Sequence, residues 1–156
     1  MDLTMDRLLA DQDADIVSVT GVPLGTATKS FSRTAMDKVL DAYRTVSNDT
    51  GFAYFFTKTG LCNSIEIKPI SEQHIHDTAR LTLDYEADLE LFRTIFEALY
   101  KPGAVFGLDD VVSFLNQNPD ALTLNAHVDK EYWKRHSAKT VIEFEDSSGR
   151  IQRITT

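Results

Sequence analysis

The pattern of apolar and polar positions along this chain predicts a mixture of short strands and amphipathic helices. Strands are expected at 16–20, 29–31, 52–56, 63–70 and 79–84, and a β-hairpin from 141–145 and 150–154. Helices are expected at 4–10, 32–43, 86–100 and 108–116, with one more turn at 132–136. Strands interspersed with helices are typical of the α/β class.

Three local signals set boundaries within this pattern. Ser32 is a candidate N-cap for the helix that follows it, because its hydroxyl can accept a backbone N–H. The residue types of 47–51 predict the turn that closes that helix. Pro69 removes a backbone donor, so the strand at 63–70 is expected near a sheet edge.

The segment 79–100 joins a predicted strand to a predicted helix, and Asp84 lies at the joint. Open α/β sheets place ligand-binding groups at the carboxyl ends of strands, just before the next helix. Arg80 has the same side-chain parity as Asp84 on the predicted strand, so both residues are expected to face one side of the sheet. The two residues are therefore candidates for a site.

Composition is that of a globular domain, with 156 residues, 42% apolar and 26% charged. This length suits one hydrophobic core. No apolar run approaches a membrane span, and the first residues lack a secretory signal, so no membrane association is expected. The single Cys62 cannot form an internal disulfide, which fits a reducing cytoplasm.

A formal net charge of −8 argues against nucleic acid as a partner, because the 16 Lys and Arg residues are scattered among 24 Asp and Glu residues. A nucleotide remains possible, since Mg²⁺ can carry positive charge into an acidic site.

Residues 80–92, which read RLTLDYEADLELF, resemble the RLTVDxPEDLEL segment of the cytidylyltransferase family. That family includes the spore-coat-polysaccharide, acylneuraminate and 3-deoxy-manno-octulosonate types. The resemblance runs in family order from Leu3 to Lys130 and matches the family's second half only. Its other pieces are Ala14–Ser18, Pro23-x-Gly25, Phe31–Arg33 with Ala35, Phe106-x-Leu108-x-Asp110-Val111, Asn118-Pro119 and Leu124–Val128.

The resemblance implies a partial doubly wound, Rossmann-like nucleotidyltransferase sheet with flanking helices. We expect residues 1–137 to form this carboxyl-terminal half and residues 138–156, where the resemblance has ended, to form the β-hairpin tail. The implied reaction joins CTP to a sugar acid with release of pyrophosphate.

The resemblance also implies residue roles. Asp84 would be catalytic and would ligate Mg²⁺ together with a second aspartate from the family's first half. Arg80 would steady that carboxylate or contact a substrate anion. Thr26, Thr28 and Lys29 fall where family members line the sugar-acid pocket. Two structural alternatives stay open: Asp84 merely caps the next helix, and Arg80 makes a plain ion pair.

Several family features are missing. The sequence has no basic, glycine-containing triphosphate loop and no Asp-x-Pro-Leu segment with the partner metal ligand. The family's proline between Asp84 and Asp88 is absent, and Asn48–Gly51 replaces its His-Val-Thr. We therefore expect a chain that is inactive alone and binds Mg²⁺ only in a complete active site.

A sheet without its first βαβ units would expose strand edges, which favours a homo-oligomer or a separate N-terminal half as partner. The alternative function is a non-catalytic oligomerisation or partner-binding module on the same fold.

Two histidine motifs carry less specific signals. His74 and His76 have strand-like spacing for zinc, but no third ligand is nearby, which favours an incidental pair. His127 is expected to be a hydrogen-bonded structural residue.

Overall fold

The computed structural model describes residues 2–46 and 51–155, which form two compact units. Unit 1 contains the described residues of 1–19, 28–67 and 133–156, and unit 2 contains 20–27 and 68–132. The helices of unit 1 are α1 (Asp2–Ala10), α2 (Arg33–Ala42) and α3 (Tyr54–Thr57), and its strands are β1 (Ile16–Val19), β2 (Lys29–Phe31), β3 (Ser64–Ile67), β4 (Val141–Glu145) and β5 (Ile151–Thr155). Unit 2 contains η1 (Glu72–His74), α4 (Glu86–Leu99), α5 (Leu108–Gln117) and α6 (Pro119–Leu122), and α7 (Ala126–Lys139) belongs to it up to Tyr132.

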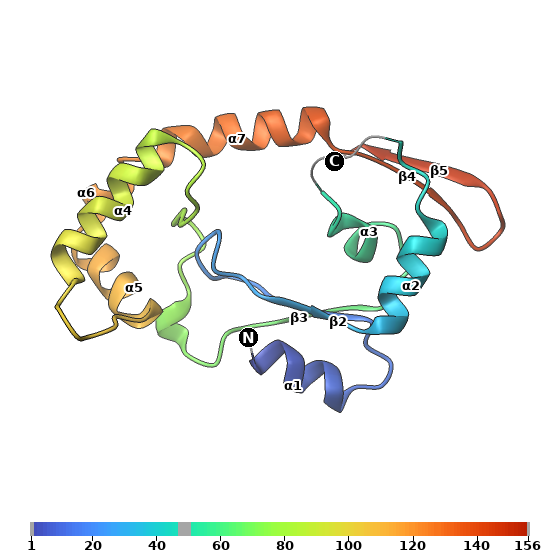
Figure 1. The fold of residues 1–156 in the computed structure, drawn as a ribbon, viewed down its shortest axis with the longest axis horizontal. Coiled ribbons are helices and arrows are strands. Elements are labelled where there is room, and N and C mark those ends of the chain that lie inside the picture. The colour runs from blue at the N-terminus through green and yellow to red at the C-terminus, as the bar shows by residue number, and fades with distance from the viewer. Residues whose placement is uncertain (1, 47–50, 156) are drawn as a thin grey trace. The chain divides into compact units, whose positions relative to one another are not determined.

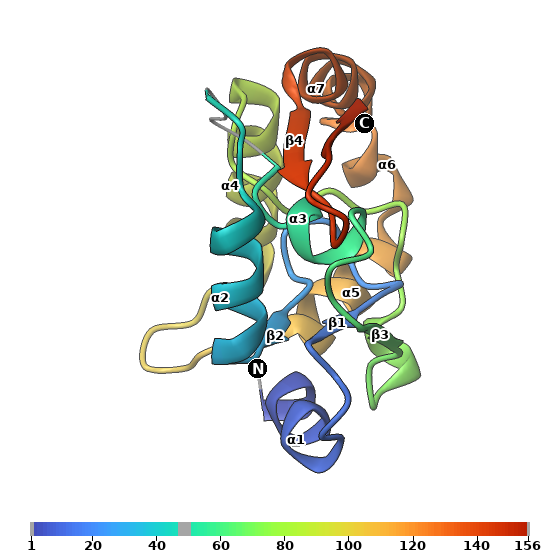
Figure 2. The ribbon, with the colours of Figure 1, turned by 90° about the vertical axis from the view of Figure 1, so that its right-hand side faces the viewer.

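Unit 1 is built on a three-stranded sheet with the order β2-β1-β3 (Figure 1). β1 pairs antiparallel with β2 and parallel with β3, where Val17 lies opposite Ile65. Helices cover both faces of the sheet, with α1 on one side and α2 and α3 on the other (Figures 1 and 2). Every residue of β1 is buried, as expected for a strand enclosed by helices on both faces.

The two faces of β1 supply two separate apolar clusters. Val17 packs with Leu8 of α1, and Ile16 packs with Val39 of α2 and Phe55 of α3. The C-terminal hairpin β4–β5 joins the second cluster through Ile142 and Phe144, which are 0% and 4% exposed. Docking on a core supplies the stability that an isolated hairpin lacks in water.

These observations confirm a mixed α/β fold with a small sheet, flanking helices and a C-terminal antiparallel hairpin. The edge position of β3 and the helix cap at Ser32 are confirmed as well, since the Ser32 hydroxyl accepts the Ala35 N–H at 3.0 Å. The predicted turn at 47–51 falls mostly on 47–50, which lie outside the described residues. The boundary expected at 137/138 stays a prediction.

Unit 2 is a helical unit whose core lies between α4, α5 and α6. Leu91 and Ile95 of α4 and Leu115 of α5 are at most 1% exposed. The loop 20–27 pairs with segment 76–81 through a parallel bridge between Leu24 and Arg80 and a hydrogen bond from the His76 N–H to the Gly21 carbonyl. Among the described residues, none of the helices has the length and apolar character needed to cross a bilayer.

Three element predictions are corrected. Residues 52–56 are not a strand, because Phe52 packs on Phe55 and Phe56 at helical spacing and Tyr54–Thr57 form α3. The strand expected at 79–84 is reduced to the one-residue bridge at Arg80. The turn expected at 132–136 is part of the longer helix α7.

Candidate functional site

The predicted site lies in unit 2, where the extended segment 80–84 meets α4. A backbone ladder fixes this segment, since Leu24 N–H donates to Ala79 and Leu81 N–H donates to Leu24, each at 2.8 Å. The ladder needs a close approach that only glycine permits. Gly25 has a φ of +96°, and a Cβ at this position would collide with the Leu81 carbonyl and lie 2.8 Å from Cγ2 of Thr82.

Arg80 is the central cation of the site and is 3% exposed. Its Nη2 donates to Oδ2 of Asp84 at 2.7 Å, and its Nε donates to Oδ1 of Asp88 at 3.0 Å. Its guanidinium also lies 4.6 Å from the ring centroid of Tyr132, within cation–π range. The predicted contact between Arg80 and Asp84 is therefore present, although the strand that was expected to align them is not.

Asp88 is an acidic residue in the first turn of α4, as the sequence predicts, but its complete burial is a feature that the sequence did not reveal. Its side chain is 0% exposed, and its Oδ2 accepts the backbone N–H groups of Asp84 and Tyr85, each at 3.0 Å. Tyr85 is the N-cap position of α4, so the carboxylate that accepts backbone N–H groups at the start of this helix is Asp88 and not Asp84. The alternative in which Asp84 caps the helix is wrong, because its carboxylate accepts no backbone N–H among the described residues.

Asn125 closes the cluster from a distant part of the chain. Its Nδ2 donates to the Arg80 carbonyl at 3.0 Å and to Oδ1 of Asp88 at 2.9 Å, and the side chain is buried. The neighbouring His127 is exposed, so the buried polar residue of this segment is Asn125. A buried amide with two acceptors of this kind locks segment 80–84 to the start of α7.

The electrostatics of the cluster keep Asp88 ionised. Burial alone would raise the pKa of its carboxyl group, but hydrogen bonds from Arg80, from the Asp84 backbone and from Asn125 outweigh burial and hold the pKa below its usual value. Burial likewise opposes the charge on Arg80, and the carboxylates of Asp88, Asp84 and Asp129 raise its pKa in the balance.

Asp84 differs from Asp88 in its exposure. Its side chain is 48% exposed, and only Oδ2 accepts a hydrogen bond from a described residue. One carboxylate oxygen therefore remains open to a ligand from solvent. The described residues contain no cluster of three or more His, Cys, Asp or Glu side chains that could hold a metal ion by themselves.

The three predicted substrate residues lie in different units. Thr26 belongs to unit 2, where its hydroxyl donates to Pro23 and it lines an apolar cavity beside Leu81. Thr28 and Lys29 belong to unit 1, at the start of β2. The two histidines that were considered as a pair contact different residues. His74 forms an ion pair with Asp109 at 2.7 Å, and His76 contacts Thr78.

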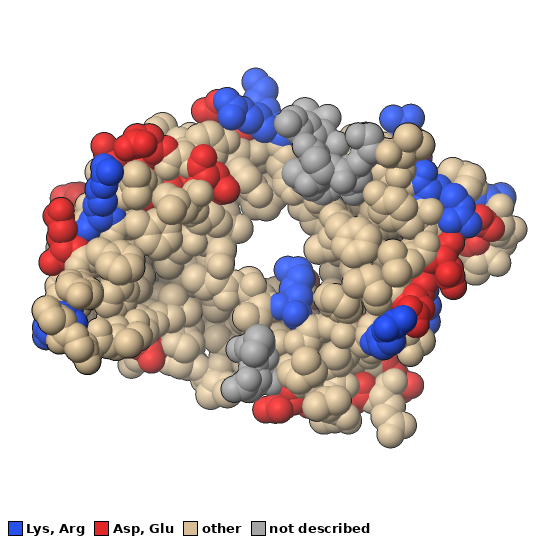
Figure 3. Space-filling view, viewed as in Figure 1, with Lys and Arg blue, Asp and Glu red and all other residues tan. Residues whose placement is uncertain are grey.

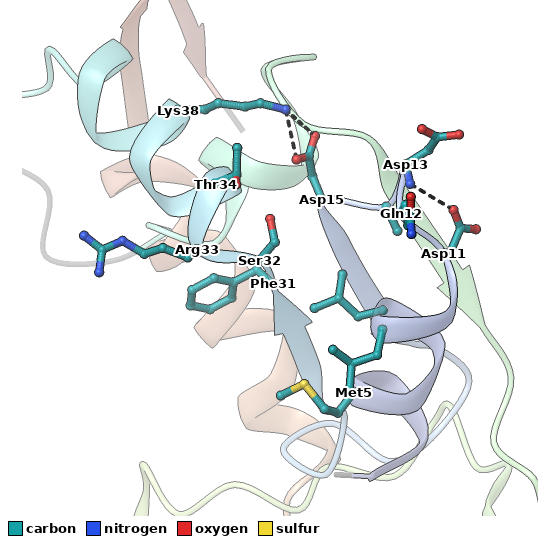
Figure 4. A pocket seen from close by; sticks show the side chains of 13 residues that line it. Met5, Asp11, Gln12, Asp13, Asp15, Phe31, Ser32, Arg33, Thr34 and Lys38 are labelled. Atoms are coloured by element: carbon teal, nitrogen blue, oxygen red, sulfur yellow. Dashed lines mark hydrogen bonds and ion pairs between the residues drawn. The ribbon is translucent and has the colours of Figure 1, made fainter.

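Unit 1 contains a cavity of about 660 Å³ between the end of α1 and the start of α2 (Figure 4). Its main charged groups neutralise each other, since Lys38 Nζ lies 2.9 Å from both oxygens of Asp15. Oδ2 of Asp15 also accepts the Asn63 N–H, which ties the start of β1 to the residue before β3. Asp15 is thus a structural residue. The Cys62 thiol is no better placed for chemistry, because burial raises its pKa.

Comparison with known proteins gives one structural likeness. No protein-family model matches the chain, and no curated protein matches it. The fold is similar to the solved structure of a cytidylyltransferase from Leptospira borgpetersenii serovar Hardjo-bovis (strain JB197), with a TM-score of 0.64 and 17% identity. The match covers 78% of this chain and 51% of that chain, so this chain spans about half the length of that protein. At this identity the likeness shows a nucleotidyltransferase-like fold.

Proposed function

We propose that this chain contributes the carboxyl-terminal part of a sugar-acid cytidylyltransferase site, with Asp84 as its magnesium-binding carboxylate. The reaction joins CTP to a sugar acid and releases pyrophosphate. The observation that carries the proposal is the asymmetry of Asp84: one oxygen is held by buried Arg80 at 2.7 Å, while the side chain is 48% exposed. The nucleotidyltransferase-like fold supports it.

The residues fit one part of a magnesium site. Mg²⁺ is usually held by one or two carboxylates together with substrate phosphates, so a single open aspartate is an adequate protein contribution. Arg80, Asp84, Asp88 and Asp129 together carry two more negative than positive charges, which favours a cation nearby. When bound, Mg²⁺ neutralises charge on the phosphate oxygens during nucleotidyl transfer.

The other residues of the cluster act by positioning. Arg80 fixes the Asp84 carboxylate in one orientation, and Asp88 and Asn125 fix Arg80 in turn. A carboxylate held in this way loses little conformational entropy when a ligand binds. Thr26, Thr28 and Lys29 stay our proposed sugar-acid contacts.

The proposed site needs a complement. Gly21–Gly25 lacks both the glycine spacing and the lysine of a phosphate-binding loop, so other residues must hold the triphosphate. We assign that role to a nucleotide-binding half, supplied in the cytoplasm by further polypeptide or by a separate chain of different sequence. Self-association of this chain into a homo-oligomer is a separate proposal, because a second copy lacks the same segments. Without the complement, turnover should be negligible.

Pyrophosphate release tests this proposal. The purified chain with CTP, Mg²⁺ and a panel of sugar acids should give no rate above background. When a complementing half is added, activity should appear, and Asp84→Ala should abolish it while Glu66→Ala on β3 leaves it unchanged. A robust rate from the purified chain alone, or an unchanged rate for Asp84→Ala, would contradict the assignment.

One observation favours the second candidate, a non-catalytic binding module. The buried guanidinium of Arg80 faces the protein's own acidic groups, with Asp129 3.8 Å from Nη1, so Arg80 is built into the fold. If the polar cluster around Asp84 is purely structural, millimolar Mg²⁺ with CTP should not perturb the resonances of residues around Asp84 even when the complementing half is present. This result would leave the module as the better description.

A further inference from the structure

An apolar groove opens between α4 and α5 in unit 2. Its cavity of about 280 Å³ is lined by Phe92, Ile95 and Phe96 of α4, by Phe106 and by Leu108 and Val111 of α5, and we call it the α4–α5 groove. Phe96 lies edge-on to Phe106, with ring centroids 5.1 Å apart, and is 50% exposed. Folding alone does not require so large an aromatic surface to stay in water.

The apolar surface continues past the end of α4. A second cavity of about 250 Å³ shares Phe106 with the groove and includes Val105, which is 99% exposed. Tyr100, at the end of α4, is 61% exposed. Exposed apolar residues that cluster around a cavity, rather than being scattered singly, mark an interaction site.

The charge of unit 2 indicates which partner this surface suits. Unit 2 has 5 Lys and Arg residues against 12 Asp and Glu residues, a formal net charge of −7, and thus carries nearly all of the chain's −8. Exposed acidic side chains lie along α4, where Figure 3 shows red patches with one blue patch between them. Glu97 directly follows Phe96, and Asp110 lines the adjoining cavity together with Lys101. The groove itself is lined by no acidic side chain, but Asp110 accepts the N–H of Gly107 in its lining, so acidic charge lies directly beside it.

The size of the groove selects the kind of occupant. Sites for drug-sized ligands and cofactors are usually about 300–1,000 Å³, so this cavity suits a single large side chain better than a whole cofactor. Interface hot spots are commonly one aromatic or aliphatic anchor in such a pocket. A second copy of unit 2 is disfavoured as the occupant of this groove, because two such surfaces with a net charge of −7 each would repel one another, whereas a homo-oligomer formed through other surfaces is not affected.

We infer that the α4–α5 groove docks a basic segment of a partner protein, which inserts one large apolar side chain beside Phe96 and pairs its Lys or Arg residues with the acidic rim. This function is independent of Asp84, which does not line the groove. The groove does share Thr26 with the proposed sugar-acid contacts, so the two proposals are separated through Asp84: a failure of magnesium binding at Asp84 leaves the docking proposal intact, and the reverse is also true.

Fluorescence anisotropy with the full chain tests the docking surface. The probe is a labelled synthetic peptide with a central Leu and Phe between lysines. One control peptide has every lysine replaced by glutamate, and another has the Leu and Phe replaced by serine. The basic apolar probe should bind with a dissociation constant in the micromolar range, and its binding should weaken as the salt concentration is raised. The serine peptide should bind roughly 10-fold more weakly, and the glutamate peptide should not bind.

Matched variants locate the binding. Phe96→Ser should weaken binding of the probe peptide roughly 10-fold, as expected for the loss of an anchor contact. Glu97→Lys should weaken it about 3-fold, as expected for the reversal of a charge at the edge of the groove. Phe31→Ser and Glu66→Lys make the same chemical changes at exposed sites of unit 1 and should have no effect. Far-UV circular dichroism checks that each variant is folded, and Glu97→Lys is the safer test because Glu97 is exposed.

Three results would overturn the proposal. The first is equal binding of the basic and glutamate peptides. The second is equal weakening by the control variants. The third is a dimer, detected by light scattering, that Phe96→Ser dissociates, because the groove would then belong to a second copy of the chain.

Discussion

The Nε atom of Arg80 donates a hydrogen bond of 3.0 Å to Oδ1 of Asp88, and this pair is the buried centre of the polar cluster in unit 2. The two side chains are 3% and 0% exposed. A buried charge is tolerated only when it is paired and hydrogen-bonded, and here Asn125 and two backbone N–H groups complete the pairing. The half-exposed Asp84 carboxylate is hydrogen-bonded to this buried pair through Arg80.

Two identical substitutions separate the buried carboxylate from the exposed one. Asp88→Asn leaves Arg80 without its buried counter-charge and should lower the free energy of unfolding by about 3 kcal/mol. Asp84→Asn, which alters a half-exposed partner of the same guanidinium, should cost less than about 1 kcal/mol. Urea denaturation followed by circular dichroism measures both values. Equal costs would mean that burial does not distinguish the two pairs.

The depressed pKa of Asp88 predicts a loss of stability in acid. Its folded-state pKa lies below the unfolded value of about 3.9, so the stability it contributes is fully present above that value and is lost as the pH falls through the folded pKa. The free energy of unfolding should therefore fall more steeply for the wild-type chain than for Asp88→Asn below about pH 4. Parallel pH profiles would contradict the lowered pKa.

Gly25 should tolerate no side chain. Gly25→Ala places a Cβ against the Leu81 carbonyl at a φ of +96°, and we expect a loss of about 2 kcal/mol or more in the free energy of unfolding. Gly103 in the same unit is the control, since its φ is +79° and a Cβ there would meet no atom within 4 Å. Gly103→Ala should cost only the backbone strain, about 1 kcal/mol. Equal effects would exclude the close approach as the cause.

Asp146 should hold the turn of the C-terminal hairpin. Its Oδ1 accepts the N–H groups of Ser148 and Arg150, at 2.8 and 3.1 Å, and its Oδ2 accepts a bond from Gln152. Hydrogen bonds from the Ser148 and Gln152 side chains and from the Arg150 backbone hold the pKa of this carboxyl group well below its usual value.

Asp146→Ala should make the amide hydrogens of Ser148 and Arg150 exchange several-fold faster. Asp146→Asn keeps an acceptor oxygen for the same turn and should largely preserve the slow exchange. Hydrogen exchange followed by NMR makes the measurement, and an unchanged rate in Asp146→Ala would show that the strand pairing alone fixes the turn.

Local sequence signals correctly predicted the helices and strands whose formation depends on residues close together in the sequence. The cap at Ser32, the helices α4 and α5 and the strands β4 and β5 each follow from spacing or from turn chemistry within a few residues. The aromatic run 52–56 misled because consecutive apolar residues fit a buried strand and a buried helix equally well. Phe52, Phe55 and Phe56 have helical spacing, which was the signal that could have decided it.

The sequence predicted the local contact of the candidate site but not the long-range one. The contact between Arg80 and Asp84 was predicted correctly, since the two residues lie only four positions apart along one segment. The bond between Asn125 and Asp88 joins residues 37 positions apart, and no local pattern encodes it. The resemblance marked the segment around His127, yet burial selected Asn125 two residues earlier. Long-range packing decided which polar residue became structural.

Paramagnetic broadening by Mn²⁺, a substitute for Mg²⁺, tests the central claim most directly, because it reports binding without catalysis. In NMR spectra of the labelled full chain, mixed with the complementing nucleotide-binding half and titrated with Mn²⁺ and CTP, the amides of Leu83 and Tyr85 should broaden first, and Asp84→Asn should abolish this effect. Asp120→Asn, which removes an exposed carboxylate on α6, should leave it unchanged. Equal broadening in wild type and Asp84→Asn, or none near residue 84, would contradict the assignment of Asp84 as the metal-binding carboxylate.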